Sequence, residues 1–166
     1  MKCRSNIVLI GMPGAGKSTV GVVLAKKLEF RFVDSDLVIQ EKYGKLLSEL
    51  IAEHGVEGFL EIENQVNASL EGRNCVIATG GSVVYGKEAM EHLRSIGKVV
   101  YLKLSYKEIE RRLGDLTARG VVLKEGQTLK SLYDERVPLY EKYAHITISC
   151  SHKMLRRVAE EIASVT

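Results

Sequence analysis

A glycine-rich segment near the N-terminus carries the clearest chemical signal of this sequence. Residues 11–18 read Gly-Met-Pro-Gly-Ala-Gly-Lys-Ser and match the pattern GxxxxGK followed by Ser or Thr. Glycines allow a sharp turn in which several backbone N–H groups point toward one anion, and the lysine adds a positive charge. A serine hydroxyl at the next position suits a magnesium ion. The pattern predicts a loop that binds the phosphates of a nucleoside triphosphate together with Mg²⁺.

Each residue of this loop has a role that follows from its type. Lys17 is predicted to reach the β- and γ-phosphates and to be catalytic, and Ser18 is predicted to ligate magnesium. The residues predicted to bind the nucleotide through this motif are Gly11, Gly14, Ala15, Gly16, Lys17, Ser18 and Thr19. The alternative is a glycine-rich turn that only happens to precede a lysine. A strand pattern before the loop and a helical pattern after it argue against that alternative.

Polar residues also follow two later apolar runs. An Asp-Ser-Asp sequence at 34–36 follows the run at 30–33, and Thr-Gly-Gly-Ser at 79–82 follows the run at 75–78. Ligands of open α/β sheets bind outside the carboxyl ends of the strands, so both groups are predicted to lie beside the glycine-rich loop. The two aspartates could hold magnesium waters or accept a proton from a substrate hydroxyl, or they could cap the helix that follows.

Apolar runs and helical patterns alternate along the whole chain. Strands are predicted over residues 5–10, 30–33, 75–78, 99–104 and 146–148. Helices are predicted over residues 17–28, 36–43, 46–53, 57–70, 87–95, 105–113 and 128–143, and from about residue 153 onward. Apolar runs this short are typical of strands that are buried on both faces. They predict an α/β fold in which helices cover a parallel sheet.

Two places interrupt this alternation. Pro138 lacks the N–H for a hydrogen bond inside a helix, so we expect a kink or a helix boundary there. Residues 114–126 contain three glycines and show weak periodicity, which predicts a mobile lid.

Length and composition limit the class of protein further. With 166 residues, 45% hydrophobic and 27% charged, residues 1–166 are expected to form a single domain. No stretch approaches the about 20 apolar residues that cross a bilayer. Three widely spaced cysteines favour a reduced, cytoplasmic setting, and a net charge of +3 gives no reason to expect a nucleic-acid partner. We expect a monomer with neither a membrane nor a nucleic acid as partner.

The glycine-rich loop alone is compatible with GTPases, motors and kinases of nucleotides or small molecules. The chain is short for a motor, and it contains no guanine-recognition motif of the NKxD kind. From residue 7 to about residue 148 it resembles the shikimate kinase family. The segments that carry the resemblance are GMPGAGKST, DSD, GVEGFLEIE, VIATGG, IERRL and ERVPLYEKYA.

This resemblance implies a fold and an activity. The fold is a five-stranded parallel sheet of the nucleoside-monophosphate-kinase type, with a substrate-binding helical segment near residues 34–63 and the lid near 114–126. The activity is ATP-dependent transfer of the γ-phosphoryl group to a hydroxyl of a small metabolite, here shikimate to shikimate 3-phosphate in aromatic amino acid biosynthesis. Mg²⁺ is the metal that the family uses.

The resemblance also assigns roles to substrate-site residues. Asp36 would hydrogen-bond the substrate hydroxyls, and Asp34 would support magnesium and orient the nucleophile, which makes both predicted catalytic residues. Gly80 and Gly81 would bind substrate through the backbone, with the N–H of Gly81 as donor. Arg136 would bind the substrate carboxylate.

Two further arginines are implied on the nucleotide side. Arg112 would lie against the adenine ring. Arg119 would reach the phosphates from the lid and stabilise the transferring charge as a catalytic residue. A solvated loop arginine remains the alternative for Arg119.

Three positions depart from the family pattern. Leu60 stands where the family has an arginine that binds the shikimate carboxylate, and Ser82 stands where it has a glycine. Arg119 is followed by Gly-Val-Val at 120–122 instead of proline and two leucines. Leu60 leaves open a related kinase for a different hydroxylated metabolite. A nucleotide-binding regulatory module without turnover is a third hypothesis, which the intact loop and both aspartates disfavour.

Overall fold

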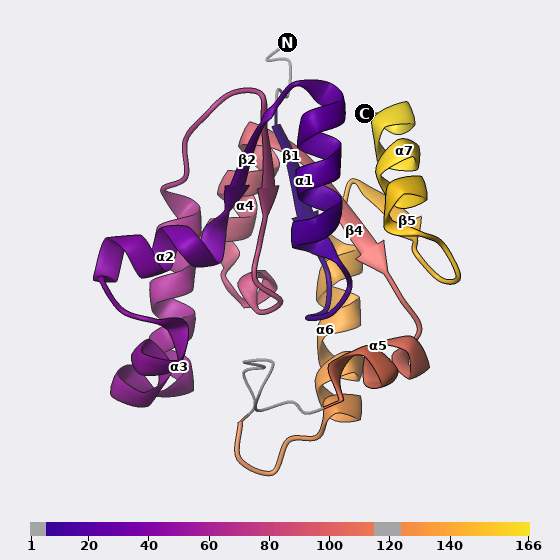
Figure 1. The fold of residues 1–166 in the computed structure, drawn as a ribbon. Helices are drawn as coiled ribbons and strands as arrows, with labels where there is room; N and C mark the ends of the chain where they lie inside the picture. The colour runs from indigo at the N-terminus through magenta and orange to yellow at the C-terminus, as the bar shows by residue number, and fades with distance from the viewer. Residues whose placement is uncertain (1–5, 115–123) are drawn as a thin grey trace.

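The computed structural model describes residues 6–114 and 124–166. In these residues five strands form one parallel sheet in the order β2-β3-β1-β4-β5 (Figure 1). The strands are β1 (Asn6–Ile10), β2 (Arg31–Asp34), β3 (Cys75–Ala78), β4 (Gly97–Lys103) and β5 (Ile146–Ser149). The predicted α/β fold with a covered parallel sheet is confirmed.

Helices cover both faces of this sheet. They are α1 (Lys17–Leu28), α2 (Ser35–Tyr43), α3 (Leu47–Ala68), α4 (Lys87–Ile96), α5 (Tyr106–Leu113), α6 (Leu129–Tyr143) and α7 (Leu155–Val165), with a short 3₁₀ helix η1 (Val83–Tyr85). Figure 1 shows α1 and α7 on one face and α4 and α6 on the other. The carboxyl ends of the strands point to one edge, the lower edge in this view, which α2, α3 and α5 flank.

The central strand, β1, is buried along its whole length, as expected for a sheet with helices on both faces. Every residue of β1 is buried, including the polar Asn6. The Asn6 amide donates to the carbonyl oxygens of Gly72 (2.9 Å) and Ile96 (3.1 Å), and its Oδ1 accepts from the N–H of Cys75 (3.0 Å). These bonds satisfy the amide and tie the starts of three neighbouring strands together.

The bounds of β4 differ from the sequence-based expectation, and glycines explain this difference and a break in α3. β4 begins at Gly97 and ends at Lys103, whereas the apolar run alone predicts 99–104. A Cβ on Gly97 would lie 2.7 Å from the Asn6 carbonyl oxygen, so glycine allows pairing to start two residues earlier. The predicted separation of the helices over 46–53 and 57–70 is confirmed as a kink in α3, where Gly55 has a φ of 73° and a ψ of 176°.

Of the two outcomes expected at Pro138, a kink or a helix boundary, the boundary does not occur. α6 continues through Pro138 to Tyr143. Packing offsets the missing backbone bond, since the buried ring of Tyr140 stacks on Tyr101 of β4 with centroids 5.0 Å apart.

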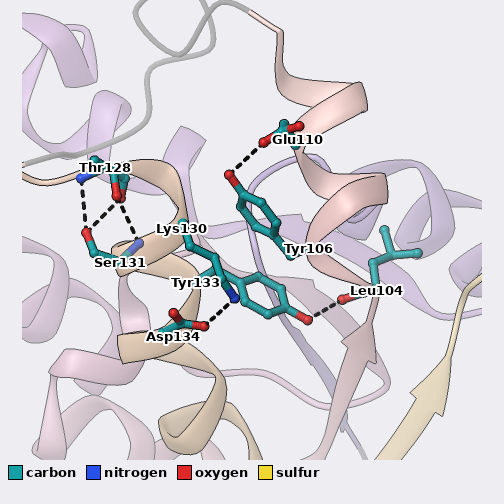
Figure 2. A network of polar contacts seen from close by, with 8 residues as sticks. All are labelled: Leu104, Tyr106, Glu110, Thr128, Lys130, Ser131, Tyr133 and Asp134. Carbon is teal, nitrogen blue, oxygen red and sulfur yellow. Dashed lines mark hydrogen bonds and ion pairs between the residues drawn. The ribbon is translucent and has the colours of Figure 1, made fainter.

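The N-terminal part of α6 is fixed against the end of β4 and against α5, as Figure 2 shows. The Tyr133 hydroxyl donates to the Leu104 carbonyl oxygen at 2.7 Å, and its ring meets Tyr106 edge to face with centroids 5.7 Å apart. Lys130 Nζ lies 5.1 Å and 5.6 Å from the centroids of these two rings. Thr128 caps the helix through the Ser131 N–H at 3.1 Å. These contacts set the position of α6 one turn before Arg136.

The predicted lid at 114–126 falls mostly outside the described residues, which include 114 and 124–126 of it. Along the parts of the chain that the structure covers, none of the helices combines the length and apolar character that a membrane span requires.

Candidate active site

The glycine-rich loop lies between β1 and α1 and has the backbone geometry that its glycines predict. Gly14 and Gly16 have φ values of 81° and 93°, which favour glycine over any residue with a side chain. Because Gly16 is the residue before α1, no side chain caps the first N–H groups of that helix. Those N–H groups and the helix dipole suit a phosphate group.

Lys17 is held inside this loop. Its Nζ donates to the carbonyl oxygens of Gly11 at 2.7 Å and Met12 at 2.9 Å, and the residue is 8% exposed. Burial lowers the pKa of Lys17 to about 8, against the opposing effect of the Asp36 charge. The lysine is thus a buried, pre-positioned donor beside the phosphate-binding N–H groups.

Ser18 and Asp34, the two residues predicted to support magnesium, come together. The Ser18 hydroxyl lies 3.4 Å from Asp34 Oδ2. Asp34 Oδ1 also accepts from the N–H groups of Asp36 (3.0 Å) and Leu37 (3.4 Å), so it caps α2 as well. Within residues 6–114 and 124–166 no cluster of three or more His, Cys, Asp or Glu side chains could hold a metal. A hydroxyl and one carboxylate fit a Mg²⁺ ion that takes its other ligands from substrate phosphates and water.

A pocket beside the loop is lined by residues from five parts of the chain. Its polar lining residues are Asp36 of α2, Glu63 of α3, Gly80, Gly81 and Ser82 after β3, and Arg136 of α6. Its other lining residues are Pro13, Leu47, Ile51 and Phe59. The pocket therefore lies at the carboxyl ends of the strands, where ligands of such sheets bind.

Two carboxyl groups in this pocket approach the same backbone segment. A Cβ on Gly80 would lie 2.7 Å from Glu63 Oε2 and 2.9 Å from Asp36 Oδ1. Burial raises the pKa of Asp36 to about 6, helped by the nearby Asp34 charge. Burial also raises the pKa of Glu63 to about 7, although the hydrogen bond from Ser82 acts in the opposite direction. Both groups can therefore change protonation state near neutral pH.

The positive charge opposite these carboxyls is Arg136, which is 2% exposed. Its Nε donates to the Tyr85 hydroxyl at 3.4 Å, and its guanidinium lies 5.3 Å from the Tyr85 ring centroid. A Cβ on Gly81 would lie 3.0 Å from Arg136 Nη1, and the Tyr140 hydroxyl donates to the Gly81 carbonyl oxygen at 2.6 Å. Glycine at 81 thus permits the close approach of the guanidinium.

The structure brings most of the sequence-predicted residues to this one edge. Asp36, Gly80, Gly81 and Arg136 line the pocket. Arg112 lies at the glycine-rich loop, where its Nη1 donates to the Gly14 carbonyl oxygen at 3.1 Å.

Of the remaining predicted residues, two lie in the part of the chain that the structure describes. Thr19 is exposed in the first turn of α1. Ala15 is buried at the loop, where its N–H donates to the Met12 carbonyl oxygen at 3.1 Å. Arg119 lies outside the described residues.

Sequence reasoning missed the residues that hold Arg136 and Gly81 in place. Tyr85 lies in no motif, and Tyr140 lies in the segment ERVPLYEKYA but had no role assigned to it. Both reach the site only because η1 and α6 pack together in the fold. Glu63 did carry a signal, because it is a carboxylate four residues after Phe59 on one face of a helix.

A sheet in the order β2-β3-β1-β4-β5, with a phosphate-binding loop after β1 and a polar pocket at the strand ends, defines a P-loop small-molecule kinase. The family model described as shikimate kinase matches residues 13–166. The chain therefore belongs to the shikimate kinase family, whose members are ATP-dependent phosphotransferases.

Individual relatives agree with this assignment. The chain is 37% identical over 165 residues to a shikimate kinase of Thermobifida fusca, covering 98% of this chain and 95% of the relative. It is 40% identical over 160 residues to one of Legionella pneumophila, covering 95% and 91%. A solved shikimate kinase from Acinetobacter baumannii in complex with shikimate aligns with a TM-score of 0.87 at 34% identity, covering 97% of this chain and 92% of that one.

Proposed function

We propose that this protein transfers the γ-phosphoryl group of ATP to a hydroxyl of shikimate and forms shikimate 3-phosphate. The observation that carries the proposal is the pocket that joins the Asp36 carboxyl to the buried Arg136 guanidinium beside the phosphate-binding loop. A carboxyl that accepts a proton and a cation that binds a carboxylate are the two groups that a hydroxy acid acceptor needs. The solved relative in complex with shikimate supports this choice of acceptor.

On the nucleotide side, the N–H groups of the loop and Lys17 would bind the phosphates of ATP, and Arg112 would contact the adenine ring. Ser18 and Asp34 would hold Mg²⁺, which when bound offsets the negative charge of the phosphates. Lys17 suits this role because its charge is already held at the loop by two carbonyl oxygens.

On the acceptor side, residues 34–63 would form the substrate-binding segment. Asp36 would accept the proton of the attacking hydroxyl, and the backbone at Gly80 and Gly81 would contact the substrate. Arg136 would bind the carboxylate. The closing role of Arg119 is proposed from the sequence pattern alone.

A coupled ADP-release assay with Mg²⁺-ATP tests the proposal, with shikimate run beside a panel of hydroxylated acids and polyols. The expected result is a kcat/KM for shikimate above about 10⁴ M⁻¹s⁻¹, within the range of natural enzymes, and values far lower for the rest of the panel. Turnover of another panel member without turnover of shikimate would contradict the proposal. ATP binding with no turnover of any member would favour a regulatory module.

A kinase for a different hydroxylated metabolite is the second candidate, and Leu60 is the observation that favours it. The absence of one hydrogen bond to a charged group, worth about 1.5–3 kcal/mol, would weaken shikimate binding roughly 10- to 150-fold. Under this alternative, Leu60→Arg gains shikimate activity that the natural chain lacks. Efficient turnover of shikimate by the natural chain, with no gain in shikimate activity from Leu60→Arg, would rule out this alternative.

A further inference from the structure

A second, smaller cavity is also lined by Arg136. Leu60 of α3 and Tyr85 of η1 line it together with Lys124 and Gln127 from the loop that leads into α6. The two spaces thus share Arg136, which also lines the pocket at the strand ends. A ligand group bound by Arg136 can therefore be contacted from the loop at 124–127.

A chain of hydrogen bonds ties this loop to Arg136. The Lys124 N–H donates to Gln127 Oε1 at 3.1 Å, and the Gln127 N–H donates to the Lys124 carbonyl oxygen at 3.0 Å. Gln127 Nε2 donates to Glu135 Oε2 at 3.3 Å. The Tyr85 hydroxyl donates to Glu135 Oε1 at 2.6 Å and accepts from Arg136 Nε. These hydrogen bonds fix the position of the Lys124 backbone relative to the Arg136 guanidinium.

The charges of this cavity have one sign. Among the described residues that line it, Lys124 and Arg136 are the charged ones, and both are cations. In residues 6–114 and 124–166 no carboxylate forms an ion pair with Lys124. The acidic group of this network, Glu135, already accepts hydrogen bonds from Tyr85 and Gln127. Two cations beside one cavity and an apolar wall at Leu60 suit an anionic ligand group.

We propose that Lys124 is a specificity-determining residue that binds the substrate carboxylate together with Arg136. It supplies the second positive charge that position 60 cannot supply, because Leu60 is apolar. A lysine on a long flexible stem acts as a point charge, so it can serve from a loop where a bidentate arginine would need a fixed helix position. This inference rests on the proposed function, since it takes the acceptor to be a carboxylate such as shikimate.

Calorimetric binding of shikimate and of its uncharged methyl ester to the full chain tests the proposal without requiring turnover. Lys124→Met should weaken shikimate binding about 10-fold, as expected when one charge-assisted hydrogen bond is removed, and change the ester affinity less than about 2-fold. Lys124→Arg should keep the shikimate affinity, because the charge is retained. Lys142→Met is the matched control, an exposed lysine near the end of α6 that should leave both affinities unchanged.

The outcomes separate this inference from the proposed function. An unchanged shikimate affinity in Lys124→Met, or equal weakening of shikimate and ester, would overturn the role of Lys124. No shikimate binding by the natural chain would overturn both proposals. Shikimate binding that depends on Lys124, combined with no ADP release, would support Lys124 as a carboxylate contact and reject the kinase activity on shikimate.

Discussion

The Ser82 hydroxyl donates a hydrogen bond to Glu63 Oε1 at 2.6 Å, and both residues are buried in the pocket at the strand ends. Ser82 stands where the family pattern has a glycine, and its φ of −93° is one that any residue adopts. Burial raises the pKa of Glu63, while the bond from Ser82 lowers it. Ser82 therefore favours the ionised form of a carboxyl that burial would keep protonated.

Replacing Ser82 should destabilise the protein by an amount that depends on pH. In Ser82→Ala the pKa of Glu63 rises further, so stability falls more steeply as pH increases through about 7. We expect a cost of about 1.5–3 kcal/mol at pH 8, where the bond goes to a charged carboxylate, and about 0.5–1.5 kcal/mol at pH 5.5. Urea denaturation at both pH values measures the difference.

A matched control is available at Ser69, whose hydroxyl donates to the Val66 carbonyl oxygen at 2.8 Å. Ser69→Ala removes a bond to a group that does not titrate, so its cost should be the same at both pH values. Equal costs at pH 5.5 and 8 for Ser82→Ala as well would show that Ser82 does not act through the ionisation of Glu63.

Gly80→Ala should impair the acceptor site while leaving the fold in place. The added Cβ would press on Glu63 Oε2 and Asp36 Oδ1, both closer than 3.0 Å, so the carboxyls must move. Misplacement of a proton acceptor by about 1 Å costs on the order of 100-fold, and we expect kcat/KM for shikimate to fall by that factor. Steady-state kinetics with shikimate varied and Mg²⁺-ATP saturating provide the measurement.

Gly44→Ala serves as the comparison for that variant. Gly44 has a φ of 64° and open space around its Cβ position, so alanine there costs about 1 kcal/mol of stability from backbone strain. It should leave the kinetics unchanged. An equal loss of kcat/KM in both glycine variants would mean that Gly80 acts through general stability and not through the two carboxyls.

Lys17→Met should remove turnover and preserve the folded state. In the proposed mechanism the lysine is the charge that the loop directs at the transferring phosphoryl group, and loss of one such donor costs about 10²–10³ in kcat. Methionine has a similar length and avoids the cost of burying a cation, but it leaves the Gly11 and Met12 carbonyl oxygens without the Lys17 donor, so we expect a lower melting temperature with the cooperative transition retained. ADP release and thermal denaturation of the same preparation check both parts, and retained turnover would reject the proposed mechanism.

The chemistry-bearing residues were predictable wherever a local signal marks them. The glycine-rich loop fixes its own shape through Gly14 and Gly16, and the polar residues after β2 and β3 follow from strands that end at one edge. The break in α3 was predictable because Gly55 has no side chain to penalise its φ of 73°.

The features that could not be predicted depend on interactions between distant segments. The hydrogen bond between Arg136 and Tyr85 joins residues that are 51 positions apart in the sequence. The hydrogen bond from Tyr140 to Gly81 joins residues that are 59 positions apart. A helix boundary, one of the two outcomes expected at Pro138, does not occur, because packing against β4 outweighs one missing backbone bond. Lys124 lies in a loop without a motif, and only the fold brings it to Arg136.

The buried carboxyl of Asp36 lowers the stability of the fold above its pKa. That pKa is raised from 3.8 to about 6, so between these values the folded state holds a proton that the unfolded state has lost. Stability therefore falls as pH rises through this window, and the unfavourable contribution is complete above about pH 6. Asparagine mimics the neutral carboxyl, so Asp36→Asn should stabilise the ligand-free protein by roughly 1–3 kcal/mol at pH 8 and by little at pH 4.

Urea denaturation at pH 4 and pH 8 measures this gain, and Asp134→Asn provides the control, because Asp134 is an exposed residue paired with Lys130 on α6. If Asp36 is the proton acceptor, as proposed, the same Asp36→Asn protein should lose ADP release with shikimate. Gained stability together with lost turnover would show that the buried Asp36 carboxylate destabilises the fold and is required for activity. A variant that is less stable at pH 8 would instead mean that the ionised carboxylate is held by favourable interactions, and the burial argument for its raised pKa would fail.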